Sequence, residues 1–221
     1  MKKLLSVISS LLLFCFLLPL IGCNNKDGLE VYVSELRQTT FRAECDDFTL
    51  KAHYGYKETP FVKDGKVGEK AYALTIKLLG VSLDPATYSV SFDYDGTTYK
   101  DKFSLDASGG LSTSFEIKDF NQNELDVNIL CGDKTQNLKL VSIVPENTLS
   151  YIDALNKLKE SQSELIGVYF DGEDFNAEIY ARILVKEEKP YWYIAFATKD
   201  DLKALLVDGF TGEVLAIRNV F

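Results

Sequence analysis

Short runs in which apolar and polar residues alternate fill the sequence between Leu29 and Val144, and no other feature limits the possible folds as strongly. In residues 88–94 every second side chain is aromatic or aliphatic, and the residues between are serine or aspartate. Neighbouring side chains of a strand point to opposite faces, so each run predicts a strand with one buried and one solvated face. We expect strands at Leu29–Val33, Thr40–Ala43, Phe48–Tyr56, Ala71–Leu79, Tyr88–Tyr94, Thr97–Leu105, Leu111–Ile117, Leu125–Leu130 and Thr135–Val144.

Tight turns separate these strands. Asp95-Gly96 and Gly132-Asp133 each lie between two alternating runs, and glycine accepts the positive φ that a two-residue hairpin requires. Turn signals recur about every 8–12 residues, which is typical of β-sandwiches. We therefore expect a mainly β protein of two domains, in which residues 29–145 form an antiparallel β-sandwich of immunoglobulin-like type.

One segment does not fit a strand. Residues 57–70 contain Pro60, Asp64-Gly65, Gly68 and four lysines, which predicts a long hairpin loop or flap. Its two apolar residues, Phe61 and Val62, have two interpretations. They fold back as a cap on the core, or they belong to a loop that contacts a partner.

The pattern changes after Pro145. Apolar residues recur at every third position from Leu149 to Leu158, which predicts an amphipathic helix of about 15 residues, and Asn147 or Thr148 would cap its start. Further strands are expected to follow it, so residues 146–221 should form an α+β domain with the helix packed on an antiparallel sheet. The expected strands are Leu165–Phe170, Ala177–Val185, Tyr191–Ala197, Lys203–Asp208 and Glu213–Asn219.

An aromatic strand and a tight turn give this second region a family resemblance. Residues 189–196 read Lys-Pro-Tyr-Trp-Tyr-Ile-Ala-Phe, and Trp192, Ile194 and Phe196 should face the helix. Asp208 and the segment Thr211–Leu215 follow. With the leading helix, these features resemble the PEPSY domain of secreted metallopeptidase propeptides and cell-envelope proteins. The resemblance covers about residues 147–221 and implies a non-catalytic role in binding or restraining a partner, commonly a protease.

The amino terminus has the pattern of an export signal. Lys2 and Lys3 precede the apolar run Leu4–Ile21, which is followed by Gly22 and Cys23. Leu20-Ile21-Gly22-Cys23 resembles the bacterial lipobox, in which the cysteine carries a thioether-linked lipid. We expect residues 1–22 to be a lipoprotein signal peptide and residues 23–28 a lipidated tether. Two acyl chains bind a membrane stably, so the protein should lie outside the cytoplasmic membrane and be anchored there through Cys23.

The formal charge limits the possible partners. It is −9 for the whole chain and becomes −11 when the two lysines at positions 2 and 3 are removed. Nucleic acid is an unfavourable partner for such a chain, because its affinity depends on lysine and arginine at the phosphates. Anionic lipid headgroups would also repel the protein, so its membrane partner is reached through the lipid.

Two cysteines remain outside the leader and the lipobox, Cys45 and Cys131. Outside the cytoplasm a disulfide between them is permitted, and it would remove about 4–5 kcal/mol of unfolded-chain entropy. The alternative is two buried thiols that behave as small apolar side chains.

The sequence offers little for catalysis. His53 is the only histidine and lies in an expected strand, which argues against a nucleophile with a histidine base. The acidic groups Asp46-Asp47, Asp93 with Asp95, and Asp171 with Glu173 and Asp174 leave open a carboxylate-based hydrolase or carbohydrate-active enzyme. We expect no cofactor and no metal.

Exposed aromatic residues are the remaining resource for binding. Tyr191 and Tyr193, together with Phe61 and Val62, are the candidate partner-binding residues. The sequence therefore predicts a non-enzymatic, membrane-anchored lipoprotein that binds or regulates a protein, peptide or cell-wall partner, for example by restraining a peptidase.

Overall fold

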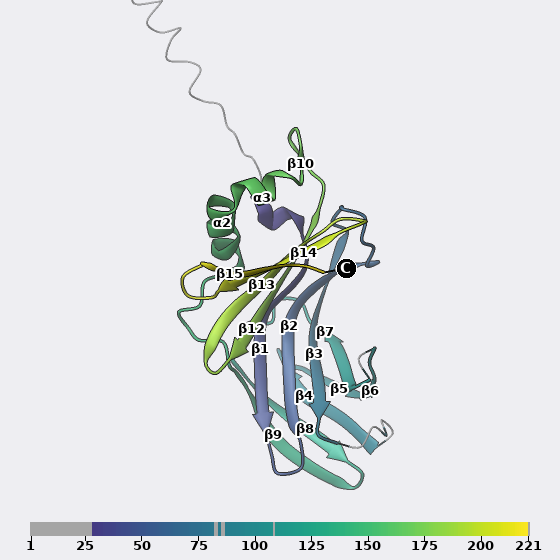
Figure 1. The fold of residues 1–221 in the computed structure, drawn as a ribbon. Helices are drawn as coiled ribbons and strands as arrows, with labels where there is room; N and C mark the ends of the chain where they lie inside the picture. The colour runs from purple at the N-terminus through teal and green to yellow at the C-terminus, as the bar shows by residue number, and fades with distance from the viewer. Residues whose placement is uncertain (1–27, 82–83, 85–86, 108, 221) are drawn as a thin grey trace, which may run out of the picture.

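The computed structural model describes residues 28–81, 84, 87–107 and 109–220. The expected signal peptide, the lipid site at Cys23 and the tether up to residue 27 lie outside the described residues. The described chain is mainly β and is dominated by a 13-stranded, largely antiparallel sheet (Figure 1). Its strands are β1 (Val33–Glu44), β2 (Thr49–Thr59), β3 (Glu69–Leu79), β4 (Tyr88–Tyr94), β5 (Thr97–Lys102), β6 (Ser104–Leu105), β7 (Leu111–Glu116), β8 (Glu124–Cys131), β9 (Lys134–Ser142), β12 (Glu178–Lys186), β13 (Lys189–Ala197), β14 (Leu202–Asp208) and β15 (Val214–Asn219).

The long strand β1 links the two halves of the chain. The main path of the sheet runs β15-β14-β13-β12-β1-β2-β3-β7-β6, and only the pairing of β1 with β12 is parallel. Strands β4, β5, β8 and β9 lie off this path, and β9 also pairs with β1 through Phe41 and Ser142. The sheet is therefore continuous across the boundary expected at residue 145.

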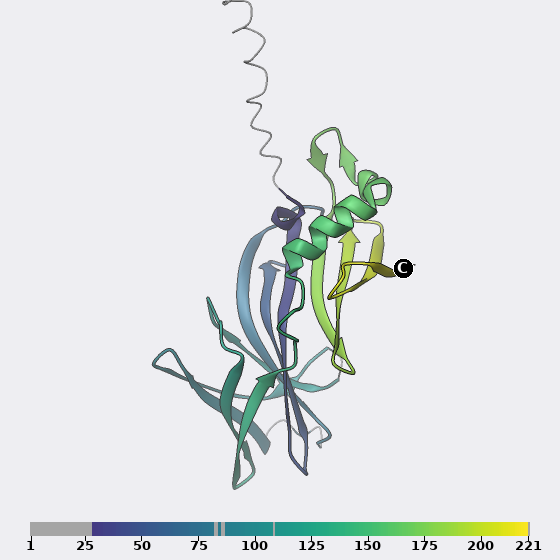
Figure 2. The ribbon, with the colours of Figure 1, turned by 90° about the vertical axis from the view of Figure 1, so that its left-hand side faces the viewer.

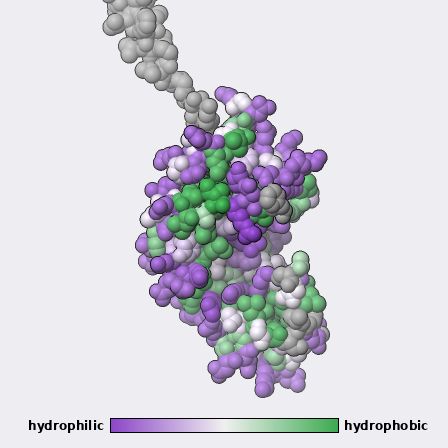
Figure 3. Space-filling view, viewed as in Figure 1, coloured by the Kyte–Doolittle hydropathy of each residue, from purple (hydrophilic) through white to green (hydrophobic). Residues whose placement is uncertain are grey.

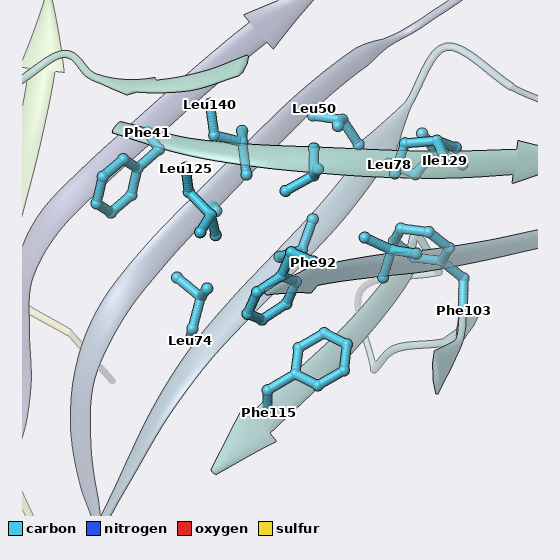
Figure 4. Packing of buried hydrophobic residues seen from close by; sticks show 14 of the residues in the cluster. Phe41, Leu50, Leu74, Leu78, Phe92, Phe103, Phe115, Leu125, Ile129 and Leu140 are labelled. Carbon is cyan, nitrogen blue, oxygen red and sulfur yellow. The ribbon is translucent and has the colours of Figure 1, made fainter. Parts of the chain in front are cut away.

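The lower ends of β1, β2 and β3 pack against the layer formed by β4, β5, β8 and β9. Alternate residues of β2, from Leu50 through Ala52 to Tyr54, point into this first core. Figure 4 shows Phe41 and Leu125 from opposite layers, with Phe92 and Phe115 beside them. The rings of Phe92 and Phe115 meet edge to face at 4.9 Å between centroids. The alternation of residues along each strand is what assembles this core.

Helix α2 (Tyr151–Ser161) covers the upper part of the same sheet (Figure 2). Its buried residues are Ala154, Leu155 and Leu158, and the second core places them with Trp192, Ile194 and Phe196 of β13, as expected. The amino-terminal part of the chain joins this core through Leu29, Val33, Leu36 and Tyr56. Both halves of the chain therefore contribute to it.

The predicted turns form as expected. Asp95 and Gly96 have φ of 47° and 72°, and Tyr94 pairs with Thr97 across them. Gly132 has φ of 58° in the turn between β8 and β9. These positive φ values explain why glycine occupies both turns.

Two expected strands are wrong. Leu29–Tyr32 is a 3-10 helix that precedes β1, and Ser163–Gly167 is a short helix, α3, that follows α2. The helix α2 is also shorter than expected, and Ser150 caps it by accepting from the Asp153 amide at 3.1 Å. Short apolar runs fit a strand or a buried helical turn equally well, and here Leu29 and Ile166 are buried against the second core.

A small hairpin, β10 (Phe170–Asp171) with β11 (Asp174–Phe175), follows α3. None of the described helices is long and apolar enough to cross a membrane. The surface view shows hydrophobic and hydrophilic residues side by side (Figure 3). Exposed apolar side chains include Val168 after α3 and Leu215 and Ile217 on the edge strand β15.

Candidate functional site

One face of the main sheet points away from both cores, and we call it the open face. Along β2 the residues between the buried ones lie on it: Lys51, His53, Gly55 and Lys57. The strand register places the following residues beside them: Arg182 on β12, Glu35, Arg37 and Arg42 on β1, Ala73, Thr75 and Lys77 on β3, and Ser112 and Ser114 on β7. A hollow of about 490 Å³ lies over the middle of this face. Gly55 and Ala73 are directly opposite each other there, and their small side chains leave the space of the hollow.

The carboxylate of Glu35 lies towards the upper end of the open face, opposite Lys57. It accepts Arg182 Nε at 2.9 Å and Nη2 at 2.6 Å, and Arg37 Nε at 2.8 Å. Burial raises the pKa of Glu35, but the hydrogen bonds and positive charges of Arg182, Arg37 and Lys57 outweigh it and hold the pKa below its usual value. Glu35 is therefore ionised, and it orients two arginines on neighbouring strands.

Three cations lie directly opposite one another across three strands. Arg42 on β1 pairs with Lys51 on β2, which pairs with Lys77 on β3, and we call these three the cationic row. Glu44 pairs with Arg42, and Asp106 with Lys77 at 2.7 Å. Lys51 forms no ion pair with any described residue. Like charges directly opposite each other destabilise a sheet, so the position of Lys51 between two cations is not explained by folding.

His53 lies between the cationic row and the arginines. It faces Thr40 and Thr75 on the neighbouring strands. Burial, followed by the charges of Arg37 and Lys77, lowers the pKa of His53 to about 4. The imidazole is therefore neutral near pH 7, and the charge of the open face there comes from its arginines and lysines.

The loop between β2 and β3, residues 60–68, folds over one end of the open face. Phe61 lies 5.8 Å from Tyr180 of β12 between ring centroids, and Lys57 Nζ lies 3.5 Å from the centre of the Phe61 ring. Phe61 and Val62 remain 45% and 49% exposed. The loop is thus shorter than expected, because β2 and β3 extend into the segment, and its aromatic residue meets the second half of the sheet.

Aromatic rings flank the arginine at this end. The Arg182 guanidinium lies 5.7 Å from the ring centre of Tyr193 and 5.8 Å from that of Tyr180. Tyr191 is two residues from Tyr193 on the same strand, opposite Leu184. The structure therefore brings Phe61 and Tyr193 of the expected binding residues to Arg182 and its neighbour Tyr180.

The two cysteines are free thiols in the structure. Cys45 Sγ donates to the carbonyl oxygen of Phe48 at 3.4 Å, and Cys131 lies beside Tyr88. Both side chains pack against the first core. Each of the two side chains is half-buried.

The expected acidic groups are on the surface. Asp46 and Asp47 are exposed in the turn after β1, and Asp171, Glu173 and Asp174 are exposed in the small hairpin. Within the described residues, no three histidine, cysteine or acidic side chains are grouped closely enough to hold a metal ion.

Three acidic residues that matter here were missed: Glu35, Glu58 and Glu178. Glu35 contacts Arg182, which is 147 residues away in the sequence, and Glu58 lies within hydrogen-bonding reach of Glu178. The alternation along β2 places Lys51 and His53 on the solvated face. The alternation does not indicate which distant strand pairs with β1 or β2.

Comparison of the sequence with protein-family models and with curated proteins, and of the fold with solved structures, found no match.

Proposed function

We propose that this protein is a non-enzymatic binding module that uses its open face to hold a negatively charged partner. The cationic row carries this proposal. Arg42 and Lys77 each have an acidic partner, but Lys51 lies between them without one among the described residues. A bound anion would offset the repulsion that Lys51 experiences from its two neighbours.

The chemistry of the open face indicates carboxylate or phosphate groups on a protein, a peptide or a cell-wall component. The arginines at its upper end are already oriented by Glu35, and guanidinium groups bind both kinds of anion through paired hydrogen bonds. The hydroxyl groups of Thr75, Ser112 and Ser114 lie between the charges and add neutral donors and acceptors. Tyr193 and Phe61 add flat apolar surface at one end.

The proposed location is the outside of the cytoplasmic membrane, with a lipid on Cys23 as the anchor. The support is the lipobox-like sequence at residues 20–23. Cys23→Ala should release the protein from membranes in a fractionation experiment. Continued membrane retention would contradict the anchor.

The proposed architecture behind this function is an immunoglobulin-like sandwich in residues 29–145 and a PEPSY-like unit in residues 146–221. The two largest hydrophobic clusters, which share Tyr72, and the packing of α2 on β13 support it. The shared strand pairing of β1 with β12 suggests that the units unfold together. Calorimetry of the whole chain would show one transition for coupled units and two for independent ones.

Binding to defined polyanions tests the proposed function. Poly-glutamate and inorganic polyphosphate serve as probes of the two anion types, and the double variant Lys51→Gln/Lys77→Gln removes two charges of the cationic row. A control variant, Lys100→Gln/Lys102→Gln, removes two exposed charges from β5. We expect at least about tenfold weaker binding for the first variant at low salt and little change for the control.

The two variants distinguish binding at the open face from nonspecific electrostatic attraction to the protein. Equal losses in both variants would indicate nonspecific attraction, and no binding of either probe by the unmodified protein would contradict the proposal. A preference between the two probes would identify the anion that the open face recognises.

A further inference from the structure

Two buried glutamates lie beneath the loop at residues 60–68. Glu58 at the end of β2 is 3% exposed, and Glu178 at the start of β12 is fully buried. The two carboxyl groups are within hydrogen-bonding reach of each other. Two negative charges so close together, away from water, would repel each other strongly.

The hydrogen bonds of the two carboxyl groups differ. Glu178 Oε1 accepts the amides of Asp64 at 2.8 Å and Gly65 at 2.9 Å, and its Oε2 accepts the Ser34 hydroxyl at 3.0 Å. Three donors suit an ionised carboxylate. In Glu58, Oε2 accepts the Gly68 amide at 2.9 Å, but Oε1 is buried without a hydrogen-bond donor. An oxygen in that position is satisfied when it carries a proton and donates it.

No neighbouring cation neutralises the pair. Lys70 is directly opposite Glu58 on β3, but its ammonium group donates to the Tyr56 hydroxyl at 3.3 Å and lies 4.5 Å from the Tyr56 ring centre. Lys57 lies over the ring of Phe61, and Arg182 is bound to Glu35. Neither glutamate forms an ion pair with a described residue.

The remaining titratable neighbours form no ion pair with the two glutamates. The loop itself carries Lys63 and Lys66, and neither is ion-paired with a described residue. On β12, burial and then the charges of Glu178 and Glu58 raise the pKa of Tyr180, so its phenol stays neutral. In the loop, Asp64 Oδ1 accepts the Lys66 amide at 3.0 Å. The next acidic residue, Glu69 on β3, is exposed.

We propose that Glu58 carries a proton that it donates to Glu178, and that this shared proton latches the loop onto β12. Loss of the proton leaves two adjacent carboxylates, and their repulsion releases the loop. The amides of Asp64, Gly65 and Gly68 then lose their buried acceptors. Release also removes Phe61 from Tyr180 and widens the upper end of the open face.

The direction of the pH effect follows from the environment of Glu58. Burial, followed by the charge and the carboxyl contact of Glu178, raises the pKa of Glu58 against the lowering effects of the Gly68 and Val62 amides. Because the folded-state pKa lies above the unfolded one, the latch is fully effective below the unfolded value. Its stabilisation is lost as the pH rises through the folded value.

Hydrogen exchange of individual loop amides tests the latch in the full-length chain. Protection of the Asp64, Gly65 and Gly68 amides is measured by NMR from about pH 4 to about pH 9 and is corrected for the intrinsic exchange rate. Amides of the β4–β5 hairpin report on global stability. We expect the loop amides to lose about tenfold protection or more as the pH rises, while the hairpin amides do not.

Three variants distinguish a loop held closed by a shared proton from a loop held closed by contacts that do not depend on pH. Glu58→Gln keeps a donor towards Glu178 and should hold the loop closed at every pH. Glu69→Gln removes one exposed charge near the loop and should retain the pH dependence of the unmodified protein. Glu178→Ala removes the acceptor of both loop amides and should leave the loop open at every pH.

Two results would overturn the latch. One is protection of the loop amides that does not change with pH in the unmodified protein. The other is a Glu58→Gln variant with the same pH dependence as the unmodified chain. Because these measurements need no ligand, they stand or fall independently of the proposed binding function.

Discussion

The two faces of the central sheet are built on the same strands but differ in almost every property. On β2, Leu50, Ala52 and Tyr54 point into the first core and are at most 2% exposed, whereas Lys51 and His53 between them point to the open face. The covered face is mostly aliphatic and aromatic. The open face is charged, and Glu35 there holds two arginines in place.

This difference distinguishes residues that stabilise the fold from residues whose presence stability does not explain. Burial of apolar side chains is the dominant favourable term in folding, so the covered face accounts for stability. The cationic row lowers stability through repulsion. Side chains that cost stability without an evident structural gain are candidates for function.

Neighbouring residues of β1 provide the strongest test of this comparison. Phe41→Ala should lower the free energy of unfolding by about 3–5 kcal/mol, because the ring is 1% exposed and contacts Phe120 in the first core. Arg42→Ala, one residue further and on the other face, should change it by less than about 0.5 kcal/mol. Urea unfolding measures both. Similar losses would mean that the open face is also structural.

Gly55 lies on the open face, but a substitution there should lower stability as much as a substitution in a core. A Cβ atom at this residue would lie 1.8 Å from the carbonyl oxygen of Leu36. Gly55→Ala should therefore cost about 2–3 kcal/mol, because the backbone of β1 must move. The control is Ala73→Ser, directly opposite on β3, with an expected change below about 1 kcal/mol. An equally mild effect of Gly55→Ala in thermal unfolding would show that β1 moves easily.

His53 should make the open face sensitive to acid. Its folded pKa of about 4 lies below the usual value of 6.5, so between these values the unfolded chain binds a proton that the native protein does not. Stability should then fall as the pH falls, by about 3 kcal/mol in total. His53→Gln should remove this part of the pH dependence, measured as the difference between the two unfolding curves. Parallel curves for both proteins would contradict the buried, neutral imidazole.

Lys51 is expected to have the smallest effect, and its sign is informative. Lys51→Gln relieves repulsion from Arg42 and Lys77 and should raise stability by about 0.2–0.5 kcal/mol at low salt. The gain should shrink as salt screens the charges. Lys100→Gln on β5 is the matched control, with no expected gain. A loss of stability in Lys51→Gln would mean that the lysine supports the fold.

Local patterns predicted much of the secondary structure. The Asp95-Gly96 hairpin follows from the glycine that its turn requires, and the alternation along β4 places its buried and exposed residues correctly. The packing of Trp192 on the helix follows in the same way. The short runs at residues 29–33 and 165–170 were wrong because a few apolar residues fit a helical turn as well as a strand.

The sequence by itself determined which side chains of each strand are buried, because residues alternate between faces and apolar surface leaves water. Only the tertiary structure decided that β1 lies parallel to β12, which brings Glu35 to Arg182 and Glu178 to Glu58. Alternation specifies the face of a residue but not its neighbour on the next strand. The pairing of distant strands depends on the packing of the whole chain, and the candidate site is made by that pairing.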